Sequence, residues 1–319
     1  MSSIEDTGID DLVQPFQIED LGIRGRVVRL GPLVDRVLTA HAYPEPVSRL
    51  LGEALALTAM IGSALKFNGR FILQTQSKGP VSLLVADYES PGKLRGYAQM
   101  DEERLADALK DGRTTAADLM GDGYLALTID QGADMERYQG IVALDPKGLS
   151  HSAHEYFASS EQVATRIRIA AGPFYHREAS GPEKNWRAGA IMIQHIPREG
   201  GLTGYREDEE ERPVTEEEEN WNRASILLDT VEDHELLDPS LEPNRLLFRL
   251  FHEDGVRAYE PAPVEFSCHC SRERMESVLR SFDGHEIDEM VQDGVITATC
   301  EFCSEVYVFA PDELKEDRN

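Results

Sequence analysis

All four cysteines of the 319-residue chain lie near its C-terminal end, in two close pairs. Cys268 and Cys270 are separated by one residue, and Cys300 and Cys303 by two. Four thiolates grouped in this way are the usual ligand set of a tetrahedral zinc site, in which each pair comes from one tight turn. The spacing therefore predicts a site for one Zn²⁺ ion. Because four thiolates leave no position for water, we expect this zinc to be structural or to act in a switch.

Two other interpretations of these cysteines are weaker. Core thiols are usually scattered along a chain, whereas these are paired. A redox-active Cys-X-X-Cys of the thioredoxin type needs a helix N-terminus after it, which lowers the pKa of the attacking thiol. Here residues 304–309, Ser-Glu-Val-Tyr-Val-Phe, have the pattern of a strand. The metal site is therefore favoured, and His269, between two of the ligands, is not counted among them.

The sequence contains no motif that indicates catalysis. Residues 63–66 match the Ser-X-X-Lys signature of penicillin-binding enzymes, but neither Ser-Asp-Asn nor Lys-Thr-Gly follows. The nine histidines show no His-Glu-X-X-His spacing, and there is no phosphate-binding Gly-X-X-X-X-Gly-Lys-Ser/Thr loop. We therefore expect a protein that is not an enzyme and that works without nucleotide hydrolysis.

The charge and hydropathy of the chain limit its partners and location. With 32 basic and 59 acidic residues, the net charge of −27 opposes binding to nucleic acid. The N-terminal residues lack the basic and apolar regions of a secretory signal, and the most apolar run, residues 54–65, is too short to span a bilayer. We therefore expect a cytoplasmic protein without nucleic-acid or membrane partners, in a compartment where paired thiols indicate a metal or redox site.

A small C-terminal domain, residues 261–319, is predicted to hold the cysteines. Ser271 can cap a helix with four apolar side chains on one face. These side chains are Met275, Val278, Leu279 and Phe282. A second short helix is expected over residues 286–291. Strands over 295–299 and 306–309 should form a hairpin that carries Cys300 and Cys303 at its tip.

Residues 205–260 are predicted to form an acidic, helical and metastable linker. Acidic residues repel one another in two runs, 207–211 and 216–219, which indicates a weakly ordered joint. Helices are expected over residues 221–231 and 244–251. The apolar face of the second helix consists of Leu246, Leu247, Leu250 and Phe251. Such a face most often packs against a neighbour; the alternative is that it can be released.

Residues 1–204 are predicted to form an α+β core domain with one main antiparallel sheet and packed helices. After a loose polar lead-in over residues 1–20, helices are expected over 33–40, over 150–159, and over a long segment that follows Pro44 and continues to Leu65. The expected strands are 23–30, 71–76, 81–88, 94–98, 124–129, 140–144, 165–170 and 188–196.

Thiolates that hold zinc are also the groups that oxidants attack. Oxidation to disulfides would remove the zinc ligands. Zinc contributes roughly 10 to 16 kcal/mol to the folding of zinc-dependent modules, more than a small core can replace. We therefore expect oxidation to unfold the C-terminal domain. Its loss would remove a packing partner from the linker helices, whose apolar faces could then bind other exposed apolar surfaces.

Short motifs along almost the whole chain carry a family resemblance. They are Tyr43-Pro44, residues 52–55 (Gly-Glu-Ala-Leu), residues 65–70 (Leu-Lys-Phe-Asn-Gly-Arg), Gln74 with Gly79-Pro80, residues 138–142 (Tyr-Gln-Gly-Ile-Val), Tyr156-Phe157 with residues 160–162 (Ser-Glu-Gln), residues 250–253 (Leu-Phe-His-Glu), residues 268–274 and residues 300–303. In these motifs the chain resembles the heat shock protein 33 family of redox-regulated holdase chaperones.

The resemblance implies zinc on the reduced cysteines Cys268, Cys270, Cys300 and Cys303. It implies that oxidation forms disulfides from Cys268 to Cys270 and from Cys300 to Cys303, with release of zinc, unfolding of the linker, dimerisation and ATP-independent capture of unfolding proteins. The chain departs from the family at Ser304, where members often have Gly or Asn, and in its longer acidic stretch.

Three functions are therefore kept for comparison. The leading hypothesis is a cytoplasmic holdase that responds to oxidative stress, inactive when reduced and zinc-bound and activated by oxidants together with heat. The second is a protein thiol-disulfide oxidoreductase that uses the same cysteines. The third is a constitutive adaptor whose zinc is only structural.

Overall fold

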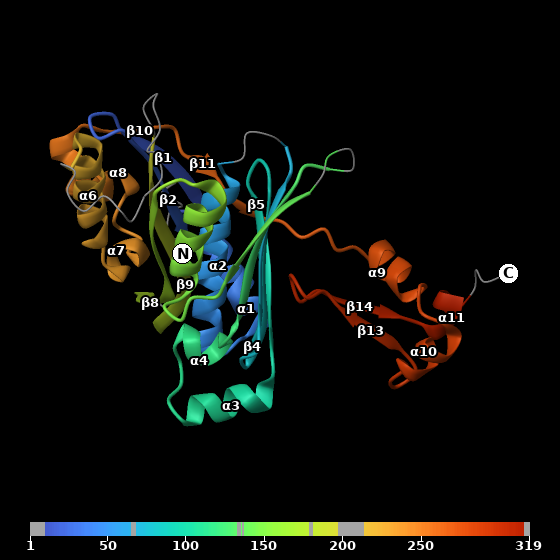
Figure 1. The fold of residues 1–319 in the computed structure, drawn as a ribbon. Helices are drawn as coiled ribbons and strands as arrows, with labels where there is room; N and C mark the ends of the chain where they lie inside the picture. The colour runs from blue at the N-terminus through green and yellow to red at the C-terminus, as the bar shows by residue number, and fades with distance from the viewer. Residues whose placement is uncertain are drawn as a thin grey trace. The chain divides into compact units, whose positions relative to one another are not determined.

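The computed structural model describes residues 10–64, 68–132, 135, 137–178, 181–196 and 214–315. The chain divides into two compact units, Met1–Phe266 and Ser267–Asn319, and Figure 1 shows the elements of each. The fold is mixed α+β with antiparallel sheets, as the sequence predicts. Within the described residues, no helix combines the length and apolar character needed to cross a membrane.

The first unit contains two six-stranded sheets, so the prediction of one main sheet is wrong. Sheet A has the order β10-β1-β2-β9-β8, with β11 also paired to β1. Its strands are β1 (Leu12–Ile18), β2 (Ile23–Leu30), β8 (Thr165–Glu178), β9 (Gly181–His195), β10 (Val256–Ala258) and β11 (Ala262–Pro263). The alternation of apolar residues identifies strands but not their partners, which here come from distant parts of the chain.

Sheet B has the order β12-β5-β4-β3-β6-β7. Its strands are β3 (Arg70–Ser77), β4 (Val81–Glu89), β5 (Lys93–Met100), β6 (Gly123–Asp130), β7 (Tyr138–Ala143) and β12 (Glu265–Phe266). Strands β3, β4 and β5 form the predicted antiparallel meander. The remaining elements of the segment are α3 (Glu102–Lys110), α4 (Ala116–Met120), α5 (Leu149–Tyr156) and a π-helical turn (Phe157–Glu161).

The long helix α2 (Glu45–Gly62) lies between the two sheets (Figure 1). It contacts β8 and β9 of sheet A and β4 and β5 of sheet B. Its side chains are buried on almost every side, which confirms the prediction from its broad apolar stripe. The predicted short helix before it is also present, as α1 (Pro32–His41).

Strand β1 replaces part of the loose lead-in that the sequence predicted for residues 1–20. Leu12, Val13, Phe16 and Ile18 are buried. Strand β1 pairs with β2 on one edge and with β10 and β11 on the other. The acidic residues at the start of the chain hid this pattern. Residues 1–9 lie outside the described part of the chain.

Three helices follow in the predicted linker: α6 (Glu216–Asp229), α7 (Asp233–Leu237) and α8 (Pro243–Phe251). The two helices expected from the sequence are confirmed as α6 and α8. Residues 216–219 are not a weakly ordered joint, because Thr215 and Glu218 form a capping box and glutamates favour the first turn of a helix. The other acidic run, residues 207–211, lies outside the described residues.

Helices α6, α7 and α8 bury their apolar faces against sheet A. The shared cluster includes Leu228, Leu236, Leu246, Leu247, Leu250 and Phe251 from the helices, with Phe16, Ile23, Val27 and Ile191 from the sheet. The rings of Phe16 and Phe251 stack with centroids 6.0 Å apart. The apolar face of α8 therefore packs against a neighbour, and its release remains a prediction.

A buried arginine also connects helix α7 to sheet A. The side chain of Arg29 in β2 is fully buried. Its Nη1 donates to the Glu235 carbonyl oxygen at 3.3 Å, and its Nη2 donates to that of Asp238. Burial lowers the pKa of Arg29 to about 10, so the side chain remains charged at neutral pH. The cation therefore faces the negative C-terminal end of α7.

Glu53, half-buried in α2, predicts a pH dependence of stability. Burial and then the charge of Asp233 raise its pKa from the ordinary 4.5 to about 7, although Arg49 opposes this rise. The folded state therefore holds a proton that the unfolded chain releases, and its stability is lost as the pH rises from 4.5 to 7. One pKa unit corresponds to about 1.4 kcal/mol. Glu53→Gln should remove this loss and gain on the order of 2 kcal/mol at pH 8.

Urea unfolding of the reduced protein at pH 5 and pH 8 would measure this effect. Glu45→Gln is the control on the same helix, because a hydrogen bond from Arg49 lowers the pKa of Glu45. Its replacement should not stabilise the protein at pH 8. Equal pH dependence in the wild type and Glu53→Gln would contradict the assignment.

The second unit contains α9 (Arg272–Leu279), α10 (Gly284–Glu289), the hairpin of β13 (Ile296–Thr299) and β14 (Val306–Phe309), and α11 (Pro311–Lys315). Ser271 caps α9 as predicted. Helix α10 begins two residues earlier than expected, because Asp283 caps it. Val278 was predicted to face the core but is 57% exposed, because α9 turns Leu279 instead towards the small core of this unit.

Candidate metal centre

The four cysteine sulfurs form one cluster in the second unit, all within 4.8 Å of one another. The Sγ atoms of Cys268 and Cys270 are 3.4 Å apart. Across the pairs, Cys268 is 3.6 Å from Cys300, and Cys270 is 3.3 Å from Cys303. Each sulfur therefore lies near sulfurs of both pairs, and the distances do not favour one way of pairing them.

Two local structures bring the sulfurs together. Cys268 and Cys270 lie in the extended segment just before α9, whose first turn is capped by Ser271. Cys300 and Cys303 lie at the tip of the β13–β14 hairpin. There the Cys300 N–H donates to the Glu305 carbonyl oxygen at 2.9 Å, and the Ser304 N–H donates to that of Cys300 at 2.8 Å. These bonds close the turn that directs both sulfurs to the same side.

The sulfur cluster fits a zinc ion. A Zn–S bond length of about 2.3 Å in a tetrahedron corresponds to sulfur separations of about 3.8 Å. The observed separations of 3.3 to 3.6 Å are close to this value. Cys300 is buried and the other three cysteines are half-buried. Among the described residues, His269 is not part of this group of possible ligands.

Cys268, Cys300 and Cys303 differ in acidity. Burial would raise the pKa of Cys268, but a hydrogen bond from the Cys270 backbone and bonds among the thiols lower it to about 7. Burial raises the pKa of Cys300 and, together with the neighbouring sulfurs, that of Cys303. Thiolates are the metal ligands, so Cys268 loses its proton more readily than Cys300 and Cys303, and binding of a cation releases protons from these sulfurs.

Ser304, the residue after the last cysteine, has a left-handed backbone with φ of 58°. This conformation destabilises a residue with a Cβ atom by roughly 1 to 2 kcal/mol, whereas glycine adopts it without this cost. Allowing for the greater freedom of glycine in the unfolded chain, Ser304→Gly should stabilise the zinc-loaded second unit by about 1 kcal/mol. Amide hydrogen exchange of β13 and β14 would measure the gain.

Glu305→Gly is the matched control for this prediction. Glu305 is the next residue, and its φ is not positive. Glycine there should lower the stability of the same hairpin by about 0.5 kcal/mol or more. If both variants destabilise the hairpin equally, the left-handed backbone at residue 304 is not a source of strain.

One further residue, Tyr307, lies at this site, and the sequence analysis did not identify it. The hydroxyl of Tyr307 donates a hydrogen bond to the Cys270 Sγ at 3.3 Å. Tyr307 alternates with the exposed residues Val306 and Val308 along β14, so it lies on the same strand face as the buried Phe309. That alternation was visible in the sequence and would have directed Tyr307 towards the inside of the hairpin.

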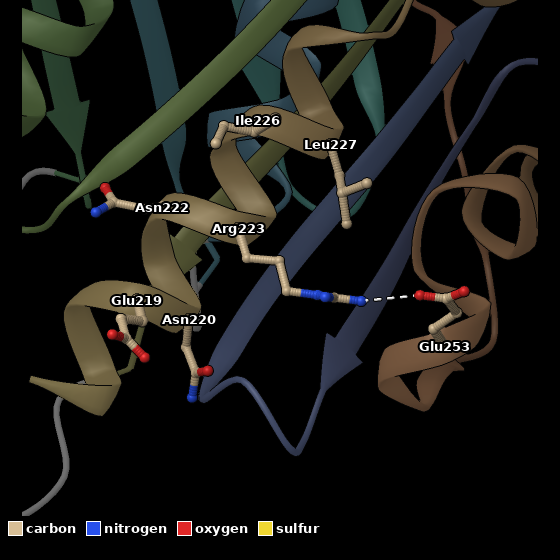
Figure 2. A pocket seen from close by; sticks show the side chains of 7 residues that line it. All are labelled: Glu219, Asn220, Asn222, Arg223, Ile226, Leu227 and Glu253. Atoms are coloured by element: carbon tan, nitrogen blue, oxygen red, sulfur yellow. Dashed lines mark hydrogen bonds and ion pairs between the residues drawn. The ribbon is translucent and has the colours of Figure 1, made fainter.

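Two other features of the described chain, Ser63 and a groove on α6, show no arrangement of reactive groups. The Ser63 hydroxyl donates to the Met60 carbonyl oxygen at 3.0 Å, as at an ordinary helix end. A groove on α6 is lined by Glu219, Asn220, Asn222, Arg223, Ile226, Leu227 and Glu253 (Figure 2). In it, Arg223 forms ion pairs with Glu253 at 3.0 Å and with Asp254 at 2.9 Å. These pairs connect α6 to the turn after α8, and the lining contains no thiol or imidazole.

The chain is similar to known proteins over almost its whole length. The model of the Hsp33 protein family matches residues 11–310. A 33 kDa chaperonin of Caulobacter vibrioides is 45% identical over 310 residues, which cover 96% of this chain and 97% of the relative. A 33 kDa chaperonin of Ectopseudomonas mendocina is 37% identical over 304 residues, covering 94% and 92%.

A solved structure gives the same fold. The crystal structure of the 33 kDa chaperonin from Thermotoga maritima, a heat shock protein 33 homolog, has a TM-score of 0.73 to this chain. It covers 96% of this chain and 97% of its own, at 23% sequence identity. At that identity the likeness concerns the fold alone.

Proposed function

The chain belongs to the Hsp33 family of chaperones, and from this premise we propose that it is a redox-regulated holdase that captures unfolding proteins without ATP. The reduced form would be inactive and would hold one Zn²⁺ on Cys268, Cys270, Cys300 and Cys303. The observation that carries the proposal is the cluster of four sulfurs within 4.8 Å in a unit with a very small core.

The small core makes the second unit dependent on its sulfurs. Only five of its described hydrophobic side chains form the buried cluster: Leu279, Ile287, Ile296, Phe309 and Leu314. When bound, zinc would link the four sulfurs and contribute folding free energy on the order of 10 kcal/mol. A core of this size cannot replace such a contribution. The fold of the unit would therefore follow the state of its cysteines.

Oxidation by a peroxide would change that state in two steps. One cysteine thiolate attacks a peroxide oxygen, an S–O bond forms, the O–O bond breaks and hydroxide leaves. A second thiolate then attacks the resulting sulfenic sulfur, an S–S bond forms and a second hydroxide leaves. Two protons convert the hydroxides to water, and the two sulfurs have lost two electrons. In line with the family, we propose the products Cys268–Cys270 and Cys300–Cys303, whose sulfurs no longer serve as metal ligands.

The connection between the units offers a route from the cysteines to the linker. Cys268 follows strand β12 after one residue, and β12 pairs with β5 in sheet B. The preceding strands β10 and β11 pair with β1, and β10 contacts helix α8. Unfolding that begins in the second unit would therefore reach β12 first, and then β11 and β10. Their loss would loosen α8 and expose the apolar faces that now pack on sheet A.

An aggregation assay with a thermally unfolding client would test the proposal. Oxidised protein should suppress aggregation, and reduced zinc-loaded protein should not. Equal suppression in both states would favour a constitutive adaptor, and turnover of a disulfide substrate by the reduced protein would favour an oxidoreductase. Light scattering would show whether the oxidised protein dimerises, as we also propose.

We also place the protein in the cytoplasm, because a reducing compartment keeps the thiols of the inactive state reduced.

A further inference from the structure

The hydroxyl of Tyr307 is positioned on one of the four sulfurs. It donates to the Cys270 Sγ at 3.3 Å, and Tyr307 itself is half-buried. Strand β14 fixes its direction, because Tyr307 is paired with Ala298 of β13 and lies on the same face as the buried Phe309. The contact is therefore built into the hairpin that carries Cys300 and Cys303, although it reaches a cysteine of the other pair.

A hydroxyl group at this position has a specific effect on sulfur. A hydrogen bond to a thiolate shares its negative charge and makes the sulfur a weaker nucleophile. In a four-thiolate zinc site the ligands carry more negative charge than the metal neutralises. A donor next to one ligand therefore stabilises the bound state, as outer hydrogen bonds do at other metal sites. Phenylalanine would pack equally well on this face and would supply neither effect.

We propose that Tyr307 is a positioning residue that sets the sensitivity of the cysteine cluster through Cys270. Its hydroxyl would slow the attack of the Cys270 sulfur on a peroxide oxygen, the first of the oxidation steps described above. It would also strengthen the hold of the reduced cluster on zinc. The inference rests on the proposed function of the four cysteines as a redox-sensitive zinc site. It adds a residue that sets how readily an oxidant acts on this site.

The variant Tyr307→Phe removes the hydroxyl and keeps the ring. Two measurements on the full-length, zinc-loaded, reduced protein would test the inference. The first is zinc affinity, by competition with a chromogenic chelator; we expect a loss of about tenfold, as for other outer-shell hydrogen bonds. The second is the initial rate of modification of each cysteine by hydrogen peroxide followed by a thiol label, resolved by peptide mass spectrometry. We expect Cys270 to react several-fold faster than in the wild type.

Val306→Thr is the matched control, since Val306 is on the same strand but faces outward and is 54% exposed. It should leave both measurements unchanged. The inference is overturned if Tyr307→Phe behaves like Val306→Thr, or if all four cysteines of Tyr307→Phe react faster by the same factor, which would indicate only a loosened hairpin. Neither measurement uses a client protein, so the inference can fail while the aggregation assay succeeds, and the reverse.

Discussion

Replacing Cys303 by serine should unfold the second unit, Ser267–Asn319, while helix α2 and sheet B of the first unit stay folded. Three remaining sulfurs and a hydroxyl bind zinc far more weakly than four thiolates. The buried cluster of the unit has five members among the described residues, too few for stability without the metal. Because zinc contributes roughly 10 kcal/mol or more in such modules, the expected loss exceeds the whole stability of the unit.

Hydrogen exchange would show this loss directly. Amides of β13 and β14 should exchange in Cys303→Ser as fast as in an unstructured chain, and amides of α2 should keep the protection of the wild type. Removal of zinc from the reduced wild type with a strong chelator should give the same pattern. Ser281→Ala, a change in the same unit away from the sulfurs, should keep the hairpin protected. A protected hairpin after zinc removal would show that the fold does not depend on the metal.

Replacing Arg29 by methionine should loosen the linker helices without any oxidation. Methionine fills a similar volume but leaves the carbonyl groups of Glu235 and Asp238 without their buried donor. Removing one partner of a buried charged interaction costs about 3 kcal/mol or more. The amides of α7 should then exchange about a hundredfold faster, since 1.4 kcal/mol corresponds to a factor of ten. Under the proposed function, the reduced variant should already suppress client aggregation.

Arg257→Met is the control for this prediction. Arg257 lies in β10, with its side chain 66% exposed, and pairs with Glu19 at 3.5 Å. Its loss should change stability by less than about 0.5 kcal/mol, because exposed ion pairs contribute little. A second variant tests how closely α7 packs on sheet A. A Cβ atom on Gly189 would lie 2.4 Å from the Leu236 carbonyl oxygen, so Gly189→Ala should displace α7 as well. Unchanged exchange of the α7 amides in Arg29→Met would contradict this role of Arg29.

Local signals in the sequence predicted the second unit well. The cap at Ser271 and the hairpin after Gly294 depend on neighbouring residues, and both are present. The paired spacing of the cysteines likewise suggested that their sulfurs meet, and the structure brings all four together. These features could be inferred because each is determined within a few residues.

The features that the sequence analysis did not predict depend on contacts between distant segments. Strand β1 pairs with the neighbouring β2 on one edge, but its other edge pairs with β10 and β11, more than 200 residues away, so the sequence around β1 gave no sign of these two partners. Arg29 alternates with apolar residues in β2 and resembles an ordinary exposed position until α7 covers it. The hydroxyl of Tyr307 acquires a role only because Cys270 comes from another segment of the second unit.

The pairing of β1 with β10 and β11 also has a consequence for synthesis of the chain on the ribosome. Strand β1 emerges early, but its outer edge is completed only by Val256–Ala258 and Ala262–Pro263. Until these residues and the helices α6 to α8 have been translated, the nascent first unit presents an unfinished strand edge and the bare apolar face of sheet A. The nascent chain would thus pass through an aggregation-prone intermediate. Slow translation before residue 256 should make the nascent chain depend more on ribosome-associated chaperones.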